Sequence, residues 1–393
     1  VGIGNSQVPT NAMLGGLAYQ DSVDVEKISK IKAKTSDTAV DIFVYDTRKD
    51  SDGGAWRKKA TTQSWYNEVP SMDRGTRKEF PAVAIIVAET SGDDTVTIYD
   101  GDDPNCPMWM VFNQSTTQLG AMVGYSNMTI GCCTMLNGIL MVGLDHTAQG
   151  NVAGLRLINF ISEHHHWKAN ITGRHSSQHW PIVDRNGGRP GVNVDSNLII
   201  NEVINDVDAI VLPNAPTDAS TGLPTPTIVI GTNGGISVIT DSGVVYDLTT
   251  NNETSSVAEI AFLDDNRYSF ATKADNSRWW VDDIQTADEN HNYFYQRTSY
   301  DYSAGGQGSI NPLGRNNGTS RGEYGEVIFR QASGMSRIRY VDTLINYTTT
   351  DYNTGWMGGE VKGAYLSSTD DTNLSGTSLI ANGDFSSSST AAF

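Results

Sequence analysis

The sequence is poor in the residues that build cross-linked, membrane-spanning or nucleic-acid-binding proteins. Its three cysteines, an odd number, give no complete disulfide framework and no paired zinc spacing. No apolar run approaches the roughly 18 residues that indicate a transmembrane helix. The 27 Lys and Arg are outnumbered by 45 Asp and Glu, which leaves a net charge of −18. Because duplex DNA and anionic lipid both require a basic face, we expect no nucleic-acid partner and no membrane insertion.

Charge of either sign is also scarce, and this excludes a coiled coil or a long helical bundle. Charged residues make up 18% of the 393 residues, whereas Gly alone occurs 39 times. Short β-branched or aromatic runs follow one another along the chain, for example Val83–Glu89, Gly138–Leu144 and Thr227–Thr232. Turn-forming residues bound nearly all of them, so we predict an all-β protein. The first residues lack a basic stretch followed by an apolar stretch, so we expect no signal peptide.

The strands are grouped in a repeating unit of strand, tight turn, strand, polar turn and strand. Three versions of it are Thr134–Phe160, Thr227–Leu248 and Val257–Ile284. Their spacing of about 50 residues, with one longer step, is typical of a β-propeller. We predict six or seven blades, beginning near Asp41, Phe80, Met128, Asn205, Val257, Tyr324 and Leu344. Two β-sandwiches in tandem are the alternative fold.

The two ends of the chain differ from the middle. Residues 1–40 show little periodicity, and we interpret them as an extended arm that docks on a partner. The propeller is expected to span residues 41–366, with its ring closed by pairing of Glu360–Leu366 with an N-terminal strand. Residues 367–393 are rich in Ser, Thr, Asp and Asn, and we expect a polar linker there.

A histidine-rich segment, Glu163–Pro190, contains five of the seven histidines. Within it, His175 and His179 are four residues apart, so on a helix they would share a face and could ligate a transition metal. The segment is rich in Gly, Ser and Asn, so the simpler interpretation is a surface loop. Trp167 and Trp180 would then either pack this loop onto the disc or contact a glycan or a protein partner.

Two acidic turns, Asp46–Gly54 and Tyr99–Asn105, offer hard oxygen ligands. In the second turn, Asp100, Asp102 and Asp103 are candidate ligands for Ca²⁺, although the full EF-hand pattern is absent. Asp, Asn and Gly are also the residues that tight turns require, which is the alternative interpretation.

Adjacent aromatic residues provide a further candidate contact. If Trp279 and Trp280 lie on a strand, one ring points inward and the other outward. The outward ring could stack on a sugar, and packing between blades is the alternative. We predict glycan or partner contact at Trp167, His175, His179, Trp180, Trp279 and Trp280, and no catalytic residue.

Three further segments have a recognisable sequence: Pro9–Asp21, Asp41–Trp65 and Thr348–Thr372. They resemble virion proteins of tailed phages, in particular tail or fibre proteins of phages of the marine and cyanophage type. The segment Leu379–Phe385 is similar to the opening of carbohydrate-binding jelly-roll modules, which often follow this propeller in such proteins. The sequence would then lead into a module of that type that is missing or truncated. The resemblance implies a virion component with a role in adsorption.

We therefore expect a structural, non-enzymatic protein of a phage tail or fibre. It would act as a rigid platform for assembly and for recognition of a host-surface polysaccharide. Its expected partners are other virion proteins and further copies of itself, as a trimer or ring. A glycan-degrading hydrolase of the depolymerase or sialidase type is an alternative, for which Arg330, Arg337 and Arg339 are the nearest arginine cluster. A purely structural nozzle or connector subunit is another.

Overall fold

The computed structural model describes the chain in a series of segments. These are residues 30, 39–90, 94–114, 121–124, 128–146, 153–170, 176–187, 198–251, 256–262, 267–272, 278–291, 300–303, 311–312, 320–321, 326–331, 334–339, 344–349 and 361–365. The expected docking arm, apart from residues 30, 39 and 40, and the expected polar linker lie outside the described residues. For residues 278–281 and from residue 300 onward, the description covers the strands and their pairing.

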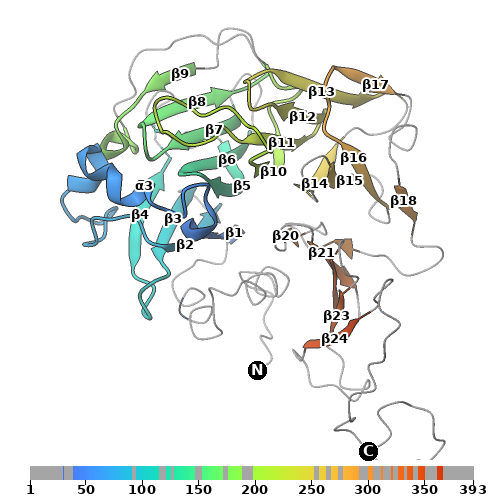
Figure 1. Ribbon diagram of the computed structural model, residues 1–393, viewed down its shortest axis with the longest axis horizontal. Coiled ribbons are helices and arrows are strands. Elements are labelled where there is room, and N and C mark those ends of the chain that lie inside the picture. The colour runs from blue at the N-terminus through green and yellow to red at the C-terminus, as the bar shows by residue number, and fades with distance from the viewer. Residues whose placement is uncertain are drawn as a thin grey trace, which may run out of the picture.

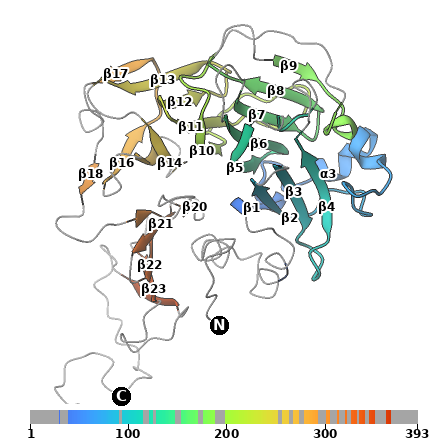
Figure 2. The same ribbon diagram turned by 180° about the vertical axis from the view of Figure 1, so that it is seen from behind.

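The described strands form five sheets, antiparallel apart from one strand pair in the third, and each is built almost entirely from consecutive strands (Figure 1, Figure 2). The first sheet contains β1 (Ala39–Asp46), β2 (Val83–Glu89), β3 (Thr95–Asp100) and β4 (Met108–Asn113). The second contains β5 (Met128–Leu136), β6 (Ile139–His146), β7 (Gly154–Asn159), β8 (His164–Lys168) and β9 (Ser176–His179).

The third sheet contains β10 (Ile204–Ile210), β11 (Thr227–Thr232), β12 (Gly235–Ile239), β13 (Val245–Thr250) and β17 (Glu289–His291). The fourth contains β14 (Val257–Phe262), β15 (Arg267–Thr272), β16 (Arg278–Asp283) and β18 (Tyr300–Ser303). The strand β17 comes from beyond β16 and pairs in parallel with β13, so the chain returns from the fourth sheet to the outer edge of the third.

The first four sheets are arranged as the blades of a β-propeller. Their first strands are neighbours in sequence order: β1 contacts β5, β5 contacts β10, and β10 contacts β14. A buried apolar cluster fills each space between successive blades. Strands such as β2 and β11 are buried on both faces, which explains their almost continuous apolar sequence. This arrangement differs from tandem β-sandwiches.

The prediction of six or seven blades is not what the structure shows, because the predicted starts near Phe80 and Leu344 fall inside sheets. The start near Phe80 precedes β2, which pairs with β1 across a long insertion. The starts near Tyr324 and Leu344 share the fifth sheet, which contains β19 (Asn311–Pro312), β20 (Ser320–Arg321), β21 (Glu326–Gln331), β22 (Gly334–Arg339), β23 (Leu344–Thr349) and β24 (Val361–Tyr365). Glu360–Leu366 was expected to close the ring by pairing with an N-terminal strand, and that pairing stays a prediction. Within the described residues its strand, β24, pairs with β23.

Candidate functional site

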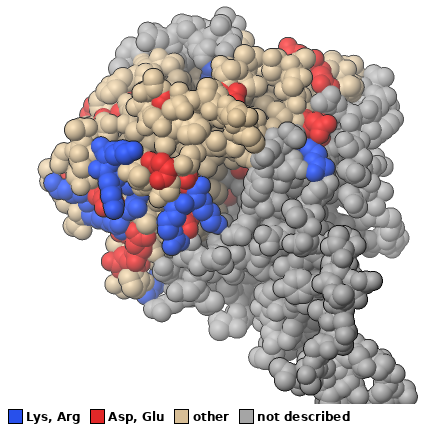
Figure 3. All heavy atoms as spheres, in the orientation of Figure 1, with Lys and Arg blue, Asp and Glu red and all other residues tan. Residues whose placement is uncertain are grey.

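The longest described interruption of the blade pattern is the connection between β1 and β2, residues 47–82, which we call the insertion. It is made of the short helices η1 (Thr47–Lys49), α3 (Trp56–Lys59), η2 (Ala60–Thr62) and η3 (Ser64–Asn67). It carries eight Lys or Arg and five Asp or Glu, in a chain of net charge −18. The blue side chains of Figure 3 gather on this part of the molecule. The insertion is therefore a locally basic element of an acidic protein.

Aromatic packing fixes the insertion against the first two blades. Trp65 is fully buried and packs edge-on against Trp109 of β4 at 5.5 Å and against Phe160 at 5.8 Å. The centre of the Phe80 ring lies 5.2 Å from that of Trp56 and 4.8 Å from that of Trp109. These rings fill the core, so the tryptophans of the insertion do not offer their faces to a sugar.

Glu163 forms a polar anchor at the end of the insertion nearest the second blade. It adopts φ 52°, a left-handed conformation that is uncommon outside glycine, and it is buried. Its carboxylate accepts hydrogen bonds from the hydroxyl of Ser64, from the amide of Ser64 at 3.1 Å and from the amide of Ile182 at 3.0 Å. The Ser64 hydroxyl in turn accepts the Val183 amide at 3.0 Å. One carboxylate thus joins η3 to η4 (Ile182–Asp184).

A second anchor surrounds Asp50, where the insertion meets the turn between β5 and β6. The Tyr45 hydroxyl and the Trp56 indole, at 2.7 Å, both donate to Oδ2 of Asp50. Its Oδ1 accepts the amide of Asn137 at 2.9 Å. Burial raises the pKa of Asp50 to about 6, and these hydrogen bonds oppose part of that rise.

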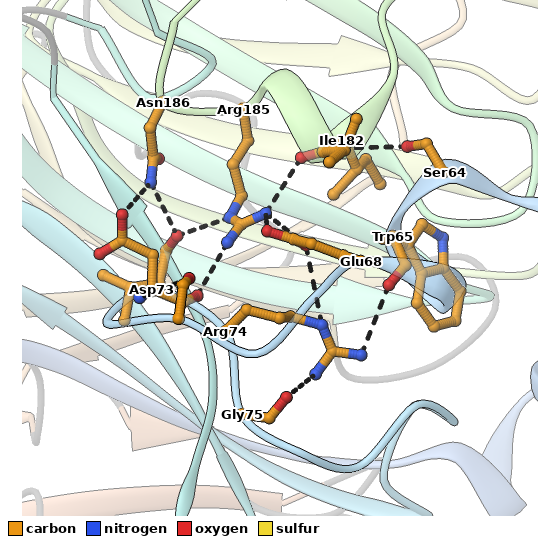
Figure 4. Close-up of polar contacts among 12 residues, drawn as sticks. Ser64, Trp65, Glu68, Asp73, Arg74, Gly75, Ile182, Arg185 and Asn186 are labelled. Carbon is orange, nitrogen blue, oxygen red and sulfur yellow. Dashed lines mark hydrogen bonds and ion pairs between the residues drawn. The ribbon is translucent and has the colours of Figure 1, made fainter.

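The third anchor is a buried ion network, shown in Figure 4, in which two guanidinium groups share one carboxylate. Arg185 donates from Nη1 to both carboxylate oxygens of Glu68, at 2.9 and 2.8 Å. Arg74 lies 3.7 Å from the same carboxylate and stacks 4.4 Å from the centre of the Trp109 ring. The side chains of Arg74 and Arg185 are only 1% and 2% exposed. Burial lowers the pKa of Arg74 to about 10, and Arg185 adds to the fall while Glu68 opposes it.

The remaining donors of these arginines bind backbone carbonyls. Arg185 donates to Asp73 at 2.8 Å and to Val111 at 2.7 Å, and Arg74 donates to Trp109 and Lys78, both at 3.0 Å. These donors are therefore committed within the protein. The network organises the local backbone and does not present an arginine cluster to an anionic substrate.

The network supports an exposed apolar turn, residues 69–73, which we call the tip. Its backbone is held by the bridge between Ser71 and Arg74 and by the amide of Val111, which donates to Asp73 at 2.9 Å. The Met72 side chain is 91% exposed and Val69 is 78% exposed. Val183 on η4 is a third exposed apolar residue, and its amide donates to the Ser64 hydroxyl. Only one other large hydrophobic side chain, Val244, is comparably exposed in the described part of the chain.

The histidine-rich segment forms strands where a loop was expected. In β8, the side chains of His165 and Trp167 are buried, and His164 and His166 alternate with them. His164 pairs with His179 of β9, so the expected four-residue helical spacing does not apply; His175 lies outside the described residues. Burial lowers the pKa of His164, and proximity to His179 adds to this effect while Asp218 opposes it.

Trp167 and Trp180 are buried, in agreement with the packing alternative and not with glycan contact. Trp167 is 4% exposed, stacks against Arg156 at 4.1 Å and donates to the carbonyl of Ala153 at 2.8 Å. Trp180 is 1% exposed and packs against His165. His179 is exposed and remains available for contact.

Trp279 and Trp280 lie on β16, as the pattern predicted. Trp280 pairs with Phe270 of β15 and Trp279 with Ala271. Their side-chain surroundings lie outside what is described, so which ring faces outward stays a prediction.

The acidic turn at the end of β3 is held by protein groups. Arg77 Nη1 lies 2.8 Å from Asp100 and 2.7 Å from Asp102. Burial alone would raise the pKa of Asp102, but the amides of Ala82 and Val83 and the Arg77 guanidinium bring it below its ordinary value. Asp103 accepts the amide of Asn105 at 2.7 Å, as in an Asx turn. The described residues contain no group of three or more His, Cys, Asp or Glu suited to a metal ion. The turn interpretation therefore fits better than a Ca²⁺ site.

Comparisons with known proteins add a limited structural likeness. No protein-family model and no curated protein matches the chain. The computationally designed Ika8 protein is 12% identical, with 73% of this chain and 69% of that one covered at a TM-score of 0.34. A streptogramin B lyase structure is 10% identical, with 72% and 79% covered at 0.36. Likeness of this degree transfers no activity, and the propeller arrangement rests on the sheets of the chain itself. In the described part of the chain, no helix has the length and hydrophobicity needed to span a bilayer.

Proposed function

We propose that the chain is a structural protein of a tailed-phage virion, located in the tail or fibre adsorption apparatus. The three segments that resemble such proteins support the virion assignment. The structure adds a specific contact element, because the insertion presents an apolar tip on a rigid propeller scaffold. In this proposal the protein breaks no bonds and acts as a platform for assembly and for recognition of host-surface glycan.

The observation that carries the platform role is the contrast between the tip and its support. Met72 and Val69 expose most of their apolar surface, whereas Glu68, Arg74 and Arg185 beneath them are largely withdrawn from water. Ordering the tip in advance reduces the entropy that would be lost on binding. Exposed apolar groups on a rigid support are typical of a protein interaction site.

The chemistry of the tip favours a protein partner with an apolar pocket and an acidic rim. Lys58, Lys59 and Lys78 are exposed on the insertion, and they would meet acidic groups around such a pocket. Other subunits of the same particle are the proposed source of this partner. His179 and the strand that carries Trp279 and Trp280 are separate candidates for glycan contact.

Two measurements test this function. Gold-labelled antibody to the chain should decorate the tails of intact particles, and particles labelled elsewhere or not at all would reject the virion role. In a reconstitution from purified tail components, Met72→Asp should reduce incorporation of the chain at least tenfold. Val244→Asp, at an exposed apolar position remote in sequence from the tip, is the matched control and should incorporate normally. Release of reducing sugar from host polysaccharide would instead support the hydrolase alternative.

A further inference from the structure

The first strands of the four blades carry the same irregularity at the same place. In each one, the pairing with the second strand shifts register near the beginning of the strand. The residues that follow the shift are Asp41 in β1, Cys132 in β5, Asp206 in β10 and Glu259 in β14. Three of these four equivalent residues are acidic, and we call Asp41, Asp206 and Glu259 the bulge acids.

Two of the bulge acids make the same contact with the next blade. Asp41 Oδ2 accepts the amide of Cys133 at 2.8 Å, and Asp206 Oδ2 accepts the amide of Ile260 at 2.9 Å. In both cases the donor directly follows the equivalent position of the next blade. A carboxylate that accepts a backbone amide forms a charge-assisted hydrogen bond, so these contacts join neighbouring blades.

The residue after each bulge position faces the preceding blade. Cys133 packs in the cluster between the first two blades, Val207 in the cluster between the second and third, and Ile260 in the next. The equivalent residue of the first blade is Ile42. It packs in a fourth cluster to which, among the described residues, only the first blade contributes: Val44, Val83, Ile85, Val87, Tyr99 and Cys106, with Ala39, Ile42 and Met108 at its margin. The first blade therefore carries an apolar face for a preceding blade.

The fifth sheet has the sequence pattern and the order of consecutive strands expected of that missing neighbour, with β19 and β20 added at the other edge of β21. Its strand β21 begins Glu326-Val-Ile-Phe, which repeats the pattern Glu259-Ile-Ala-Phe of β14 and Asp41-Ile-Phe-Val of β1. From β21 the chain pairs successively with β22, β23 and β24, as in the other blades. The strand β20, which pairs with β21, contacts β14 of the fourth blade.

We propose that this sheet is the fifth and last blade and that β21 docks between β14 and β1 to close a five-bladed ring. By equivalence, the Glu259 carboxylate accepts the amide of Val327, and the Glu326 carboxylate accepts the amide of Ile42. The Ile42 amide also donates to the carboxylate of its neighbour Asp41 at 3.0 Å, as the Val207 amide donates to the carboxylate of Asp206 at 2.9 Å. Val207 follows the one blade whose equivalent residue, Cys132, is not acidic. This closure is independent of the proposed virion role.

Hydrogen exchange of the full chain, followed by mass spectrometry of its peptides, tests the closure. Glu326→Gln should raise the exchange rate about tenfold in the peptide that contains Ile42, the ratio expected for loss of a charge-assisted hydrogen bond. Glu259→Gln should do the same for the peptide that contains Val327. Asp206→Asn is the matched control, since its contact with Ile260 is observed, and it should accelerate exchange at Ile260.

The peptide that contains Val207 distinguishes a local effect from general loosening, because its amide depends on neither glutamate. Faster exchange at Ile42 with no change at Val207 supports the closure. An unchanged Ile42 peptide in Glu326→Gln, while Asp206→Asn exposes Ile260, would overturn it. If both peptides exchange faster, the milder Glu326→Asp decides the matter: a selective effect at Ile42 supports closure, and a uniform one opposes it.

Discussion

Substitution of Glu68 by Gln is the most direct test of the buried network under the tip. The change keeps the shape of the side chain but removes the one negative charge that Arg74 and Arg185 share. Arg185 would lose a two-oxygen contact at 2.8 and 2.9 Å, and both guanidinium groups would remain buried. Breaking a buried ion pair by removing one partner costs about 3–5 kcal/mol. We expect the free energy of unfolding to fall by about that amount in Glu68→Gln.

Urea denaturation monitored by tryptophan fluorescence measures this change, because Trp65 and Trp109 lie against the network. The matched control is Arg48→Gln, which removes an ion pair with Asp46 whose arginine side chain is 63% exposed. Such exposed pairs contribute about 0–1 kcal/mol. A loss of less than about 1 kcal/mol in Glu68→Gln, equal to that of the control, would refute the view that this carboxylate holds the tip in place.

Three further predictions concern the packing around the blades. The pKa of Asp50 is raised to about 6, so its protonated form stabilises the fold fully below about pH 4, by up to about 3 kcal/mol, and this contribution is lost as the pH rises through 6. In urea titrations from about pH 4 to 7, the free energy of unfolding should therefore fall with pH in the wild type, and Asp50→Asn should lack this fall. Phe80→Ala should lower the free energy of unfolding by about 3–5 kcal/mol in the same assay, whereas a loss near 1 kcal/mol would mean that the surrounding rings close the cavity. Gly143→Ala should lower the free energy of unfolding by about 1–3 kcal/mol. The added Cβ would lie 2.2 Å from Cys132 Sγ and 2.6 Å from Ile204 Cγ2, at the contact between the second and third blades. An unchanged midpoint of thermal unfolding would contradict this.

The strands were predictable from the sequence, but the boundaries between blades were not. Runs such as Val83–Glu89 and Thr227–Thr232 are strands because both of their faces are buried between blades. The grouping failed near Phe80, since β1 and β2 pair across the whole insertion and spacing along the chain cannot show that pairing. In contrast, the predicted starts near Met128, Asn205 and Val257 did mark the first strands β5, β10 and β14, because each begins a repeat of the unit of strand, tight turn and strand.

The candidate site was largely missed at the level of sequence. Histidine and tryptophan content drew attention to Trp167 and Trp180, whose rings are buried, because aromatic type alone does not distinguish core from surface. The available signal was the accumulation of basic residues between Arg48 and Lys78 in an acidic chain. Exposure of Met72 could not be predicted, because it depends on a turn that is held by Arg185, more than a hundred positions further along the chain.

The strand β17 has a consequence for how the protein comes apart. After β16, the chain adds β17 to the edge of the third sheet beside β13, and it then adds β18 to the fourth sheet beside β16. The two sheets are therefore interlaced, and neither can peel away without freeing a strand of the other. We expect proteolytic nicking between β16 and β18 to loosen both sheets together, so that the pair melts as one cooperative block.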